Sequence, residues 1–166
     1  MTLTPVQITE LKAMINNALQ QLYDTDILLI NRHAHERSIA FRFGLYFTAL
    51  VPASSFVRDY NITVDFDYNR NGENVKGLLG FNNRHGVFPD VILHRRGHND
   101  VNILVIEFKG IWNTRQRERE VDIRKLIEFT HPQRNDYQYG LGAFVDLYPA
   151  HDKTRITYFI NGEQEQ

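Results

Sequence analysis

The chain has 166 residues, of which 42% are hydrophobic and 23% charged, and its formal net charge is −1. This length and composition fit one globular domain with a sizeable core, and we expect a single domain over residues 1–166. The chain contains no cysteine, which excludes a disulfide framework and a thiolate metal site. The near-neutral charge argues against a protein that coats nucleic acid, but not against an enzyme that binds only a few phosphate groups.

Nothing in the sequence indicates a membrane or a secretory route. Residues 1–7 lack the charged and apolar regions of a signal peptide, and no apolar run reaches the length of a membrane-spanning helix. The absence of cysteine also suits a reducing compartment. We therefore expect a soluble, cytoplasmic protein with no membrane partner.

Two helices are expected in the first 50 residues. An N-cap threonine, a proline at the first helical position and a glutamine that closes a capping box predict a helix from residue 5, and apolar residues continue at helical spacing to about Tyr23. A second helix is expected from about Arg32 to Leu50, because a proline follows at residue 52. Its apolar stripe consists of Ile39, Ala40, Phe43, Phe47 and Leu50.

The pattern changes to strands after residue 60. Apolar and polar residues alternate from Asn61 to Tyr68, which predicts a half-buried strand, and the glycine-containing stretch 69–88 is expected to be a loop or an irregular hairpin. The later elements are expected to be strands over Val91–Arg95 and Val101–Lys109, a helix over Arg115–Phe129, and strands over Tyr139–Leu147 and Arg155–Ile160. Short loops favour antiparallel pairing of the first three strands, and the helix permits a parallel crossover. The fold class predicted is an α/β sandwich with a mixed central sheet flanked by helices.

An acid and a base share one face of the strand over 101–109. Because strand side chains alternate, Glu107 and Lys109 point to the same side. Two loops are compatible with the hairpin, of two residues (98–99) or four residues (97–100), and both place Asp90 opposite Glu107, at roughly 4.5–5.5 Å between Cβ atoms. A three-residue loop or a bulge would break this register. Like charges so placed destabilise a sheet unless a cation compensates, and carboxylate oxygens are the ligands that a hard divalent cation prefers.

Glu36 is a candidate to join these residues from the second helix. The apolar residues of that helix follow Glu36 at offsets 3, 4, 7, 11 and 14, so the carboxylate heads the stripe that faces the core. A buried carboxylate requires a cation or hydrogen-bond donors. The alternative is that Glu36 is an acid of the first turn that stabilises the helix N-terminus.

These residues resemble a known group of enzymes. Pro89-Asp90, followed after sixteen residues by Glu107-Phe108-Lys109, is similar to the motif of the PD-(D/E)XK nuclease superfamily. The αβββαβ core of that superfamily, the restriction-endonuclease-like fold, corresponds to the order expected here from the second helix to Leu147. The stretches 35–47 and 64–70 are also similar to uncharacterised prokaryotic members. The N-terminal helix and the C-terminal strand lie outside the resemblance.

The resemblance implies a role for each motif residue. Asp90, Glu107 and the backbone carbonyl of Phe108 are expected to bind Mg²⁺ or Mn²⁺. Lys109 is expected to position the attacking water and help deprotonate it, and Glu36 to support a second ion or a metal-bound water. The implied activity is hydrolysis of phosphodiester bonds in DNA, or alternatively RNA.

Three alternatives remain open at this point. The motif residues can form a structural ion cluster on a solvent-facing sheet, the chain can be a non-catalytic subunit that binds a partner protein or nucleic acid, or the metal site can hydrolyse another ester. Because the chain is small, we expect weak intrinsic specificity, or a homodimer or partner protein that supplies it.

Further residues are weaker candidates for the site. Asp67 is a candidate for assisting the site, although it is expected to be solvated. Arg70 and Arg115 are candidates for binding phosphate, with a surface position as the alternative for Arg70 and a solvated helix face with i,i+4 pairs as the alternative for Arg115. Asp65 is expected to be solvated. Asp122 and Lys125 share a helix face and are candidates for a supporting layer around the motif residues.

Overall fold

The structure is a computed structural model that describes residues 1–58, 60–81 and 84–166. The strands of the described residues are β1 (Thr63–Phe66), β2 (Arg70–Asn71), β3 (Asn74–Val75), β4 (Val91–His94), β5 (Asn102–Gly110), β6 (Leu141–Leu147), β7 (Arg155–Ile160) and β8 (Glu163–Gln164). The helices are α1 (Pro5–Asn31), α2 (Glu36–Leu50), α3 (Ser55–Arg58) and α4 (Gln116–Thr130), with short 3₁₀ turns over Val51–Ala53 and His151–Lys153.

Six of the strands form one mixed sheet in the order β1-β4-β5-β6-β7-β8, and β2 pairs with β3 in a separate small hairpin. The pair β5-β6 is parallel and the other pairs of the sheet are antiparallel. The helix α4 connects the two parallel strands, as a crossover requires. This arrangement confirms the expected α/β class with a mixed sheet.

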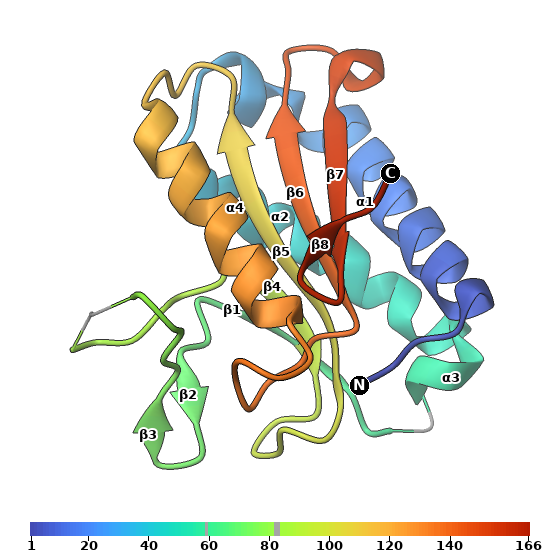
Figure 1. The fold of residues 1–166 in the computed structure, drawn as a ribbon. Helices are drawn as coiled ribbons and strands as arrows, with labels where there is room; N and C mark the ends of the chain where they lie inside the picture. Colours follow the sequence, from blue (N-terminus) through green and yellow to red (C-terminus); the bar gives the residue numbers. More distant parts are fainter. Residues whose placement is uncertain (59, 82–83) are drawn as a thin grey trace.

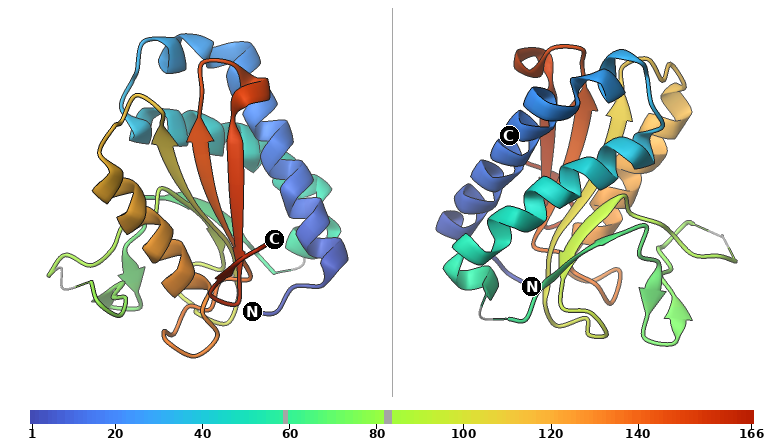
Figure 2. Two further views of the ribbon diagram at one scale, coloured as in Figure 1. Left: turned by 45° about the horizontal axis from the view of Figure 1, so that its top comes forward. Right: turned by 180° about the vertical axis from the view of Figure 1, so that it is seen from behind.

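Helices cover both faces of the sheet. The helices α1 and α2 lie on one face and α4 lies on the other (Figure 1; Figure 2). The core on the α4 side consists of Leu78, Val87, Ile92, Val105, Leu126, Phe129, Tyr137, Tyr139, Phe144 and Phe159. The strand β5 is buried along its whole length between the two layers, so any charged side chain on it must find its partners inside the protein.

The ends of the first two helices differ from the prediction. The predicted capping box of α1 is present, but the helix continues to Asn31 through a kink at Asp26 (φ −120°, ψ 23°). The helix α2 begins at Glu36 rather than Arg32, because His33 takes a left-handed conformation (φ 53°) that interrupts the helix. His35 then caps α2 by accepting a hydrogen bond from the backbone N–H of Arg37 at 3.3 Å.

Several short elements were not predicted. The strand β1 ends at Phe66 because Asp67 takes a left-handed conformation (φ 46°). The helix α3 and the strand β8 were not expected, and both are too short to leave a periodic pattern. Residues 82–83 of the predicted loop lie outside the described residues. Within the described ranges, none of the helices combines the length and the hydropathy that a membrane span needs.

The hairpin of β4 and β5 sets the register of the motif acids. Neither predicted loop is present, because the backbone N–H of Arg95 donates to the carbonyl of Val101 at 2.8 Å. That turn alone would shift the register by one residue. A β-bulge between Leu93 and His94 reverses the shift, so Val91 faces Ile106. One further step along the same register places residue 90 opposite residue 107, as the sequence predicted.

Candidate functional site

The strand β5 continues beyond its antiparallel neighbour β4. Residue 106 faces the first residue of β4, so that strand offers no partner to residues 107–110. Unpaired backbone N–H groups inside a protein are costly. Two carboxylates satisfy them: Asp90 accepts from the N–H of Phe108 at 2.8 Å, and Glu36 accepts from the N–H of Gly110 at 3.1 Å. The uncovered edge of β5 thus brings together acids from a strand and from a helix.

The same edge orients the carbonyl of Phe108. In a strand, the N–H and C=O of one residue point to the same side. Since the N–H of Phe108 points to Asp90, its carbonyl oxygen points to the edge where Asp90 and Glu36 lie. The direction of this carbonyl therefore fits the ligand role expected for it.

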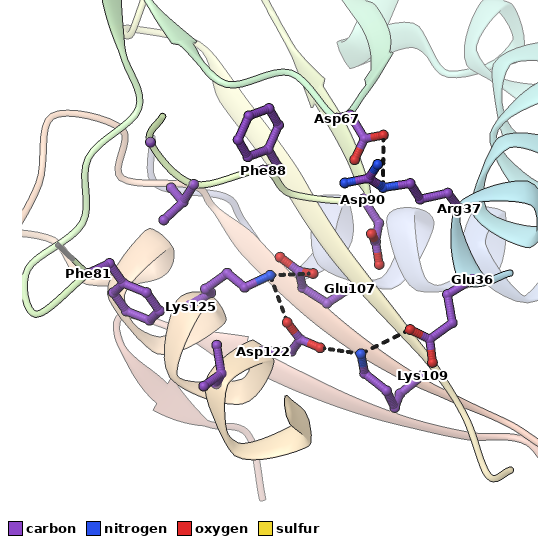
Figure 3. Close-up of a pocket in the computed structure, with 13 residues that line it drawn as sticks. Glu36, Arg37, Asp67, Phe81, Phe88, Asp90, Glu107, Lys109, Asp122 and Lys125 are labelled. Carbon is purple, nitrogen blue, oxygen red and sulfur yellow. Dashed lines mark hydrogen bonds and ion pairs between the residues drawn. The ribbon is translucent and has the colours of Figure 1, made fainter. Parts of the chain in front are cut away.

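Glu107 and Lys109 lie on the same side of β5 as the core residue Val105, beneath α4 and opposite Ile106 and Phe108 (Figure 3). Glu107 is 1% exposed and Lys109 is 6% exposed. The alternative of a structural ion cluster was placed on a solvent-facing sheet, and only that placement is wrong, because α4 covers this part of the sheet. The helix α4 contributes Asp122 and Lys125 to the same space.

A continuous chain of ion pairs links these residues. Lys109 Nζ lies 3.0 Å from Glu36 Oε2 and 2.7 Å from Asp122 Oδ2. Lys125 Nζ lies 2.7 Å from Asp122 Oδ1 and 2.9 Å from Glu107 Oε2 (Figure 3). With Asp90, four carboxylates face two ammonium groups, so the cluster carries two excess negative charges when every group is ionised.

The carboxylates of the two motif acids, Asp90 and Glu107, are incompletely compensated by neighbouring donors and positive charges. Glu107 Oε1 is buried and has no hydrogen-bond partner among the described residues. Burial raises the pKa of Asp90 to about 6 and raises the pKa of Glu107 well above its usual value. Such shifts mean that both carboxylates lack sufficient positive charge around them, a common feature of functional sites.

The cluster lines a cavity of about 420 Å³. Arg37 stands at its rim with a side chain that is 64% exposed, and it forms an ion pair with Asp67 at 3.4 Å. Phe88 contributes an apolar wall (Figure 3). A second cavity of about 610 Å³ runs along the start of α4. It shares Lys109, Asp122 and Lys125 with the first cavity, so the two cavities adjoin at these residues.

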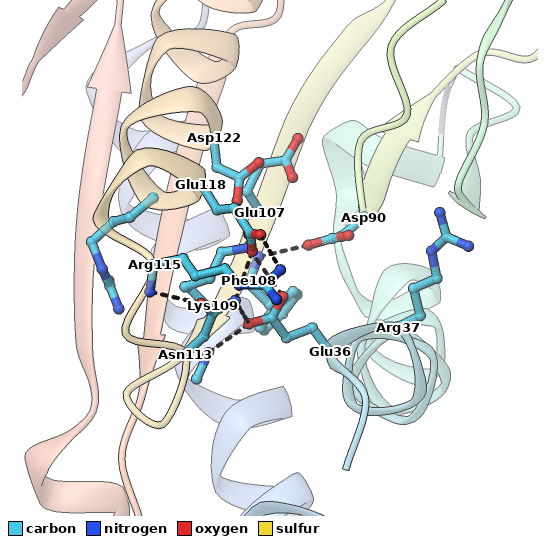
Figure 4. Close-up of polar contacts among 12 residues, drawn as sticks. Glu36, Arg37, Asp90, Glu107, Phe108, Lys109, Asn113, Arg115, Glu118 and Asp122 are labelled. Carbon is cyan, nitrogen blue, oxygen red and sulfur yellow. Dashed lines mark hydrogen bonds and ion pairs between the residues drawn. The ribbon is translucent and has the colours of Figure 1, made fainter. Parts of the chain in front are cut away.

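The structure brings together the four main candidates, Glu36, Asp90, Glu107 and Lys109 (Figure 4). The weaker candidates lie in different places. Asp67 lines the same cavity. Arg115 immediately precedes α4, pairs with Glu118 at 2.7 Å and lines the neighbouring cavity.

Arg70 does not line the cavity of the motif acids, so the structure does not support its assignment to the site. It belongs to the small β2-β3 hairpin, where its backbone carbonyl accepts a hydrogen bond from Lys76 at 2.8 Å. That hairpin projects away from the six-stranded sheet (Figure 1).

The expectation that Asp65 is solvated is wrong. Its side chain is 13% exposed and forms ion pairs with His94, at 2.8 Å, and with Arg96. Burial opposes ionisation, but hydrogen bonds from His94 and Arg96 outweigh it and hold the pKa of Asp65 well below its usual range. Asp65 and its partners therefore stabilise the β1-β4 pair rather than the cavity.

Asp122 and Lys125, the candidates for a supporting layer, line the cavity of the motif residues. Their i, i+3 spacing on a charged helix predicts a shared helix face, but it does not show that this face lies over β5. The parallel pairing of β5 with β6 fixes the position of α4, and that pairing is a tertiary property.

Within the described part of the chain, no three His, Cys, Asp or Glu side chains are grouped so as to hold a metal ion, because the lysines stand between the carboxylates. No protein-family model, no curated protein and no solved structure matches the chain.

Proposed function

We propose that this chain is a metal-dependent nuclease with a restriction-endonuclease-like core, which hydrolyses phosphodiester bonds of DNA or alternatively RNA. The observation that carries the proposal is the meeting of Asp90, Glu107 and Lys109 with Glu36 in one buried cavity. These residues match the PD-(D/E)XK motif in type and spacing. The element order α2, β1, β4, β5, α4, β6 is consistent with the αβββαβ core, with the β2-β3 hairpin as an insertion.

The donor set fits a hard divalent cation. Glu107 Oε1 lacks a hydrogen-bond partner among the described residues, and the cluster has more carboxylates than ammonium groups. Asp90, Glu107 and the Phe108 carbonyl would hold Mg²⁺ or Mn²⁺, with Glu36 supporting a second ion or a water. When bound, the metal supplies a Lewis acid that stabilises negative charge on the phosphate and the leaving oxygen.

Lys109 is suited to positioning rather than to accepting a proton. Burial lowers its pKa, but the carboxylates of Asp122 and Glu36 outweigh burial and raise the pKa above its usual value. An ammonium group has three N–H donors, of which two are directed to these carboxylates. The third donor remains for the attacking water or a phosphate oxygen.

Arg37 is placed to bind the substrate at the rim of the cavity. Its guanidinium is largely exposed and its partner Asp67 lies at 3.4 Å, so the pair is a loose one. An arginine in this position can donate to a phosphate oxygen beside the cleaved bond.

Incubation of the full chain with supercoiled plasmid and with single-stranded DNA, in Mg²⁺ or Mn²⁺, tests the proposal. We expect metal-dependent cutting that Glu107→Gln and Lys109→Met each abolish. Asp152→Asn is a matched control, because this acid is exposed and its ion pair is with its neighbour Lys153 at 3.7 Å. No cutting of DNA or RNA in any metal, or equal cutting by the two site variants, would contradict the proposal.

A second candidate is a non-catalytic subunit of the same fold that binds nucleic acid or a partner protein. The ion-pair chain favours it, because Lys109 and Lys125 already neutralise part of the acid cluster. Binding of DNA without cutting, unchanged by Glu107→Gln, is the result that would select this candidate.

A further inference from the structure

Lys125 lies outside the motif, yet it is the ion-pair partner of the motif residue Glu107. Its Nζ atom is 2.9 Å from Glu107 Oε2 and 2.7 Å from Asp122 Oδ1. The motif lysine contacts other carboxylates, those of Glu36 and Asp122. The charge of Glu107 is therefore balanced from α4 and not from β5.

The negative charges of the two motif acids, Asp90 and Glu107, are only partly compensated. Lys125 contacts one oxygen of Glu107, and the other oxygen is buried with no hydrogen-bond partner in the part of the chain that the structure describes. Asp90 accepts a hydrogen bond from the backbone of Phe108 and forms no ion pair among the described residues. Lys125 attracts both carboxylates, and Lys109 adds a weaker attraction on Asp90.

We propose that Lys125 is an internal counter-cation: it occupies Glu107 while no divalent metal is bound, and it withdraws to Asp122 when Mg²⁺ or Mn²⁺ binds. The inference rests on the metal site of the proposed function. A divalent ion at Glu107 and an ammonium group within 3 Å of the same carboxylate would repel each other strongly in a buried cavity.

The chain gives Lys125 a second position. Its side chain is a flexible four-carbon stem, so the ammonium group can move without movement of α4. Asp122 lies three residues earlier on the same helix and already contacts Lys125, so the ammonium group keeps a partner after it leaves Glu107. The side chain is 14% exposed, which places it near the wall of the cavity rather than in the apolar core.

Two opposite effects follow from this role. Without metal, Lys125 stabilises the fold, because a buried carboxylate with no cation beside it is strongly destabilising. During metal binding, the same lysine competes for Glu107 and weakens the affinity for the ion. The lysine therefore keeps the metal-free protein folded and raises the metal concentration that the site requires.

Lys125→Met tests the inference by metal binding and thermal unfolding of the full chain. We expect the metal-free variant to melt below wild type, and saturating Mn²⁺ to raise its melting temperature by more than it raises that of wild type. In calorimetric titration with Mn²⁺, the affinity of the variant should be higher by about tenfold or more. Lys153→Met is the control, since this lysine is 69% exposed and should leave both quantities unchanged.

The outcomes separate this inference from the proposed function. If Mn²⁺ binds wild type and binds Lys125→Met equally or more weakly, the counter-cation role is overturned and the metal site stands. If Mn²⁺ binds neither protein, both proposals fail.

If Lys125→Met does not fold, an NMR measurement on the wild-type protein tests the inference instead. The ¹⁵N resonance of the Lys125 ammonium group should change on addition of saturating Mg²⁺, because its hydrogen bond to Glu107 is lost. An unchanged resonance, with Mg²⁺ shown to be bound, would overturn the inference.

Discussion

Asp90 and Phe108 are joined by a hydrogen bond from the backbone N–H of Phe108 to the Asp90 carboxylate, at 2.8 Å. Because this bond needs only an oxygen acceptor, the structural role of Asp90 can be tested apart from its proposed role as a metal ligand. In Asp90→Asn the amide oxygen can still accept from Phe108, while the charge that would bind a metal is removed. We expect metal-dependent cleavage to fall by at least about 100-fold, with thermal stability close to that of wild type.

A plasmid-cleavage assay and a thermal melt of Asp90→Asn check this prediction together. Asp90→Ala is the comparison, because it also removes the acceptor of the Phe108 N–H and should lower stability by about 1–3 kcal/mol. Loss of stability in the asparagine variant equal to that in the alanine variant would show that the hydrogen bond is not what Asp90 contributes to the fold.

Arg37 should contribute to binding of DNA and not to the fold. Its exposed guanidinium at the rim of the cavity makes it a candidate for one phosphate contact. We expect Arg37→Ala to weaken DNA binding and to reduce the slope of log K against log salt by about 1, with stability within about 0.5 kcal/mol of wild type.

Binding of a labelled oligonucleotide over a series of salt concentrations measures this slope. Arg58→Ala is the matched control, since Arg58 is an exposed arginine at the end of α3 and does not line the cavity. Equal slopes for wild type and Arg37→Ala would remove Arg37 from the substrate-binding surface.

Gly110 should not tolerate a side chain. A Cβ atom at this position would lie 2.2 Å from the ring of Trp112, which itself stacks on His33 with ring centroids 4.9 Å apart. Because the N–H of Gly110 holds Glu36, displacement of the ring should also disturb the site. We expect Gly110→Ala to cost about 1–3 kcal/mol of stability and to reduce cleavage.

The fluorescence of Trp112, the only tryptophan of the chain, reports this change directly during denaturant unfolding. Gly77→Ala is the control, because a Cβ atom at residue 77 meets no atom within 4 Å. A Gly110→Ala protein with the emission and the unfolding midpoint of wild type would contradict the close packing described here.

Asp65 should make stability depend on acid pH. Its folded-state pKa is held well below the usual value, which is near 3.9 in an unfolded chain. Its contribution is therefore complete above about pH 4 and is lost as pH falls below that value, because the unfolded chain takes up the proton first. We expect Asp65→Asn to cost about 1–3 kcal/mol at pH 7 and to cost progressively less below pH 4.

Denaturant unfolding of wild type and Asp65→Asn between pH 7 and pH 3 measures this difference. Asp67→Asn serves as comparison, since the Asp67 side chain is 39% exposed in a loose pair and should change stability little at any pH. A difference between wild type and Asp65→Asn that stays constant down to pH 3 would contradict the ion pairs of Asp65.

The sequence predicted the parts of the site that depend on local periodicity. Alternation along β5 placed Glu107 and Lys109 on one face, and helical spacing placed Glu36 at the head of the buried stripe of α2. Both positions agree with the structure because the period of a strand or a helix follows from backbone geometry alone.

The register of β4 with β5, with Val91 opposite Ile106, agrees with the prediction for a reason that the structure corrects. The turn is longer than either expected loop, and a bulge at Leu93 compensates for it. Bulges carry no reliable sequence signal, so only coordinates reveal the two compensating shifts. The sequence suggested Asp122 and Lys125 as a supporting layer, but it could not predict their ion pairs with Lys109 and Glu107, because the packing of α4 over β5 depends on contacts between distant segments.

The acids of the cavity come from α2, the segment before β4, β5 and α4, in that order along the chain. No single hairpin or helix pair contains them all, so the cavity is formed only when both layers have docked on the sheet. A divalent ion held by Asp90 and Glu107 would bind the native state and not a partly folded one, and it would stabilise the whole fold cooperatively. On the proposed function, this coupling would leave a chain that is still folding without cleavage activity.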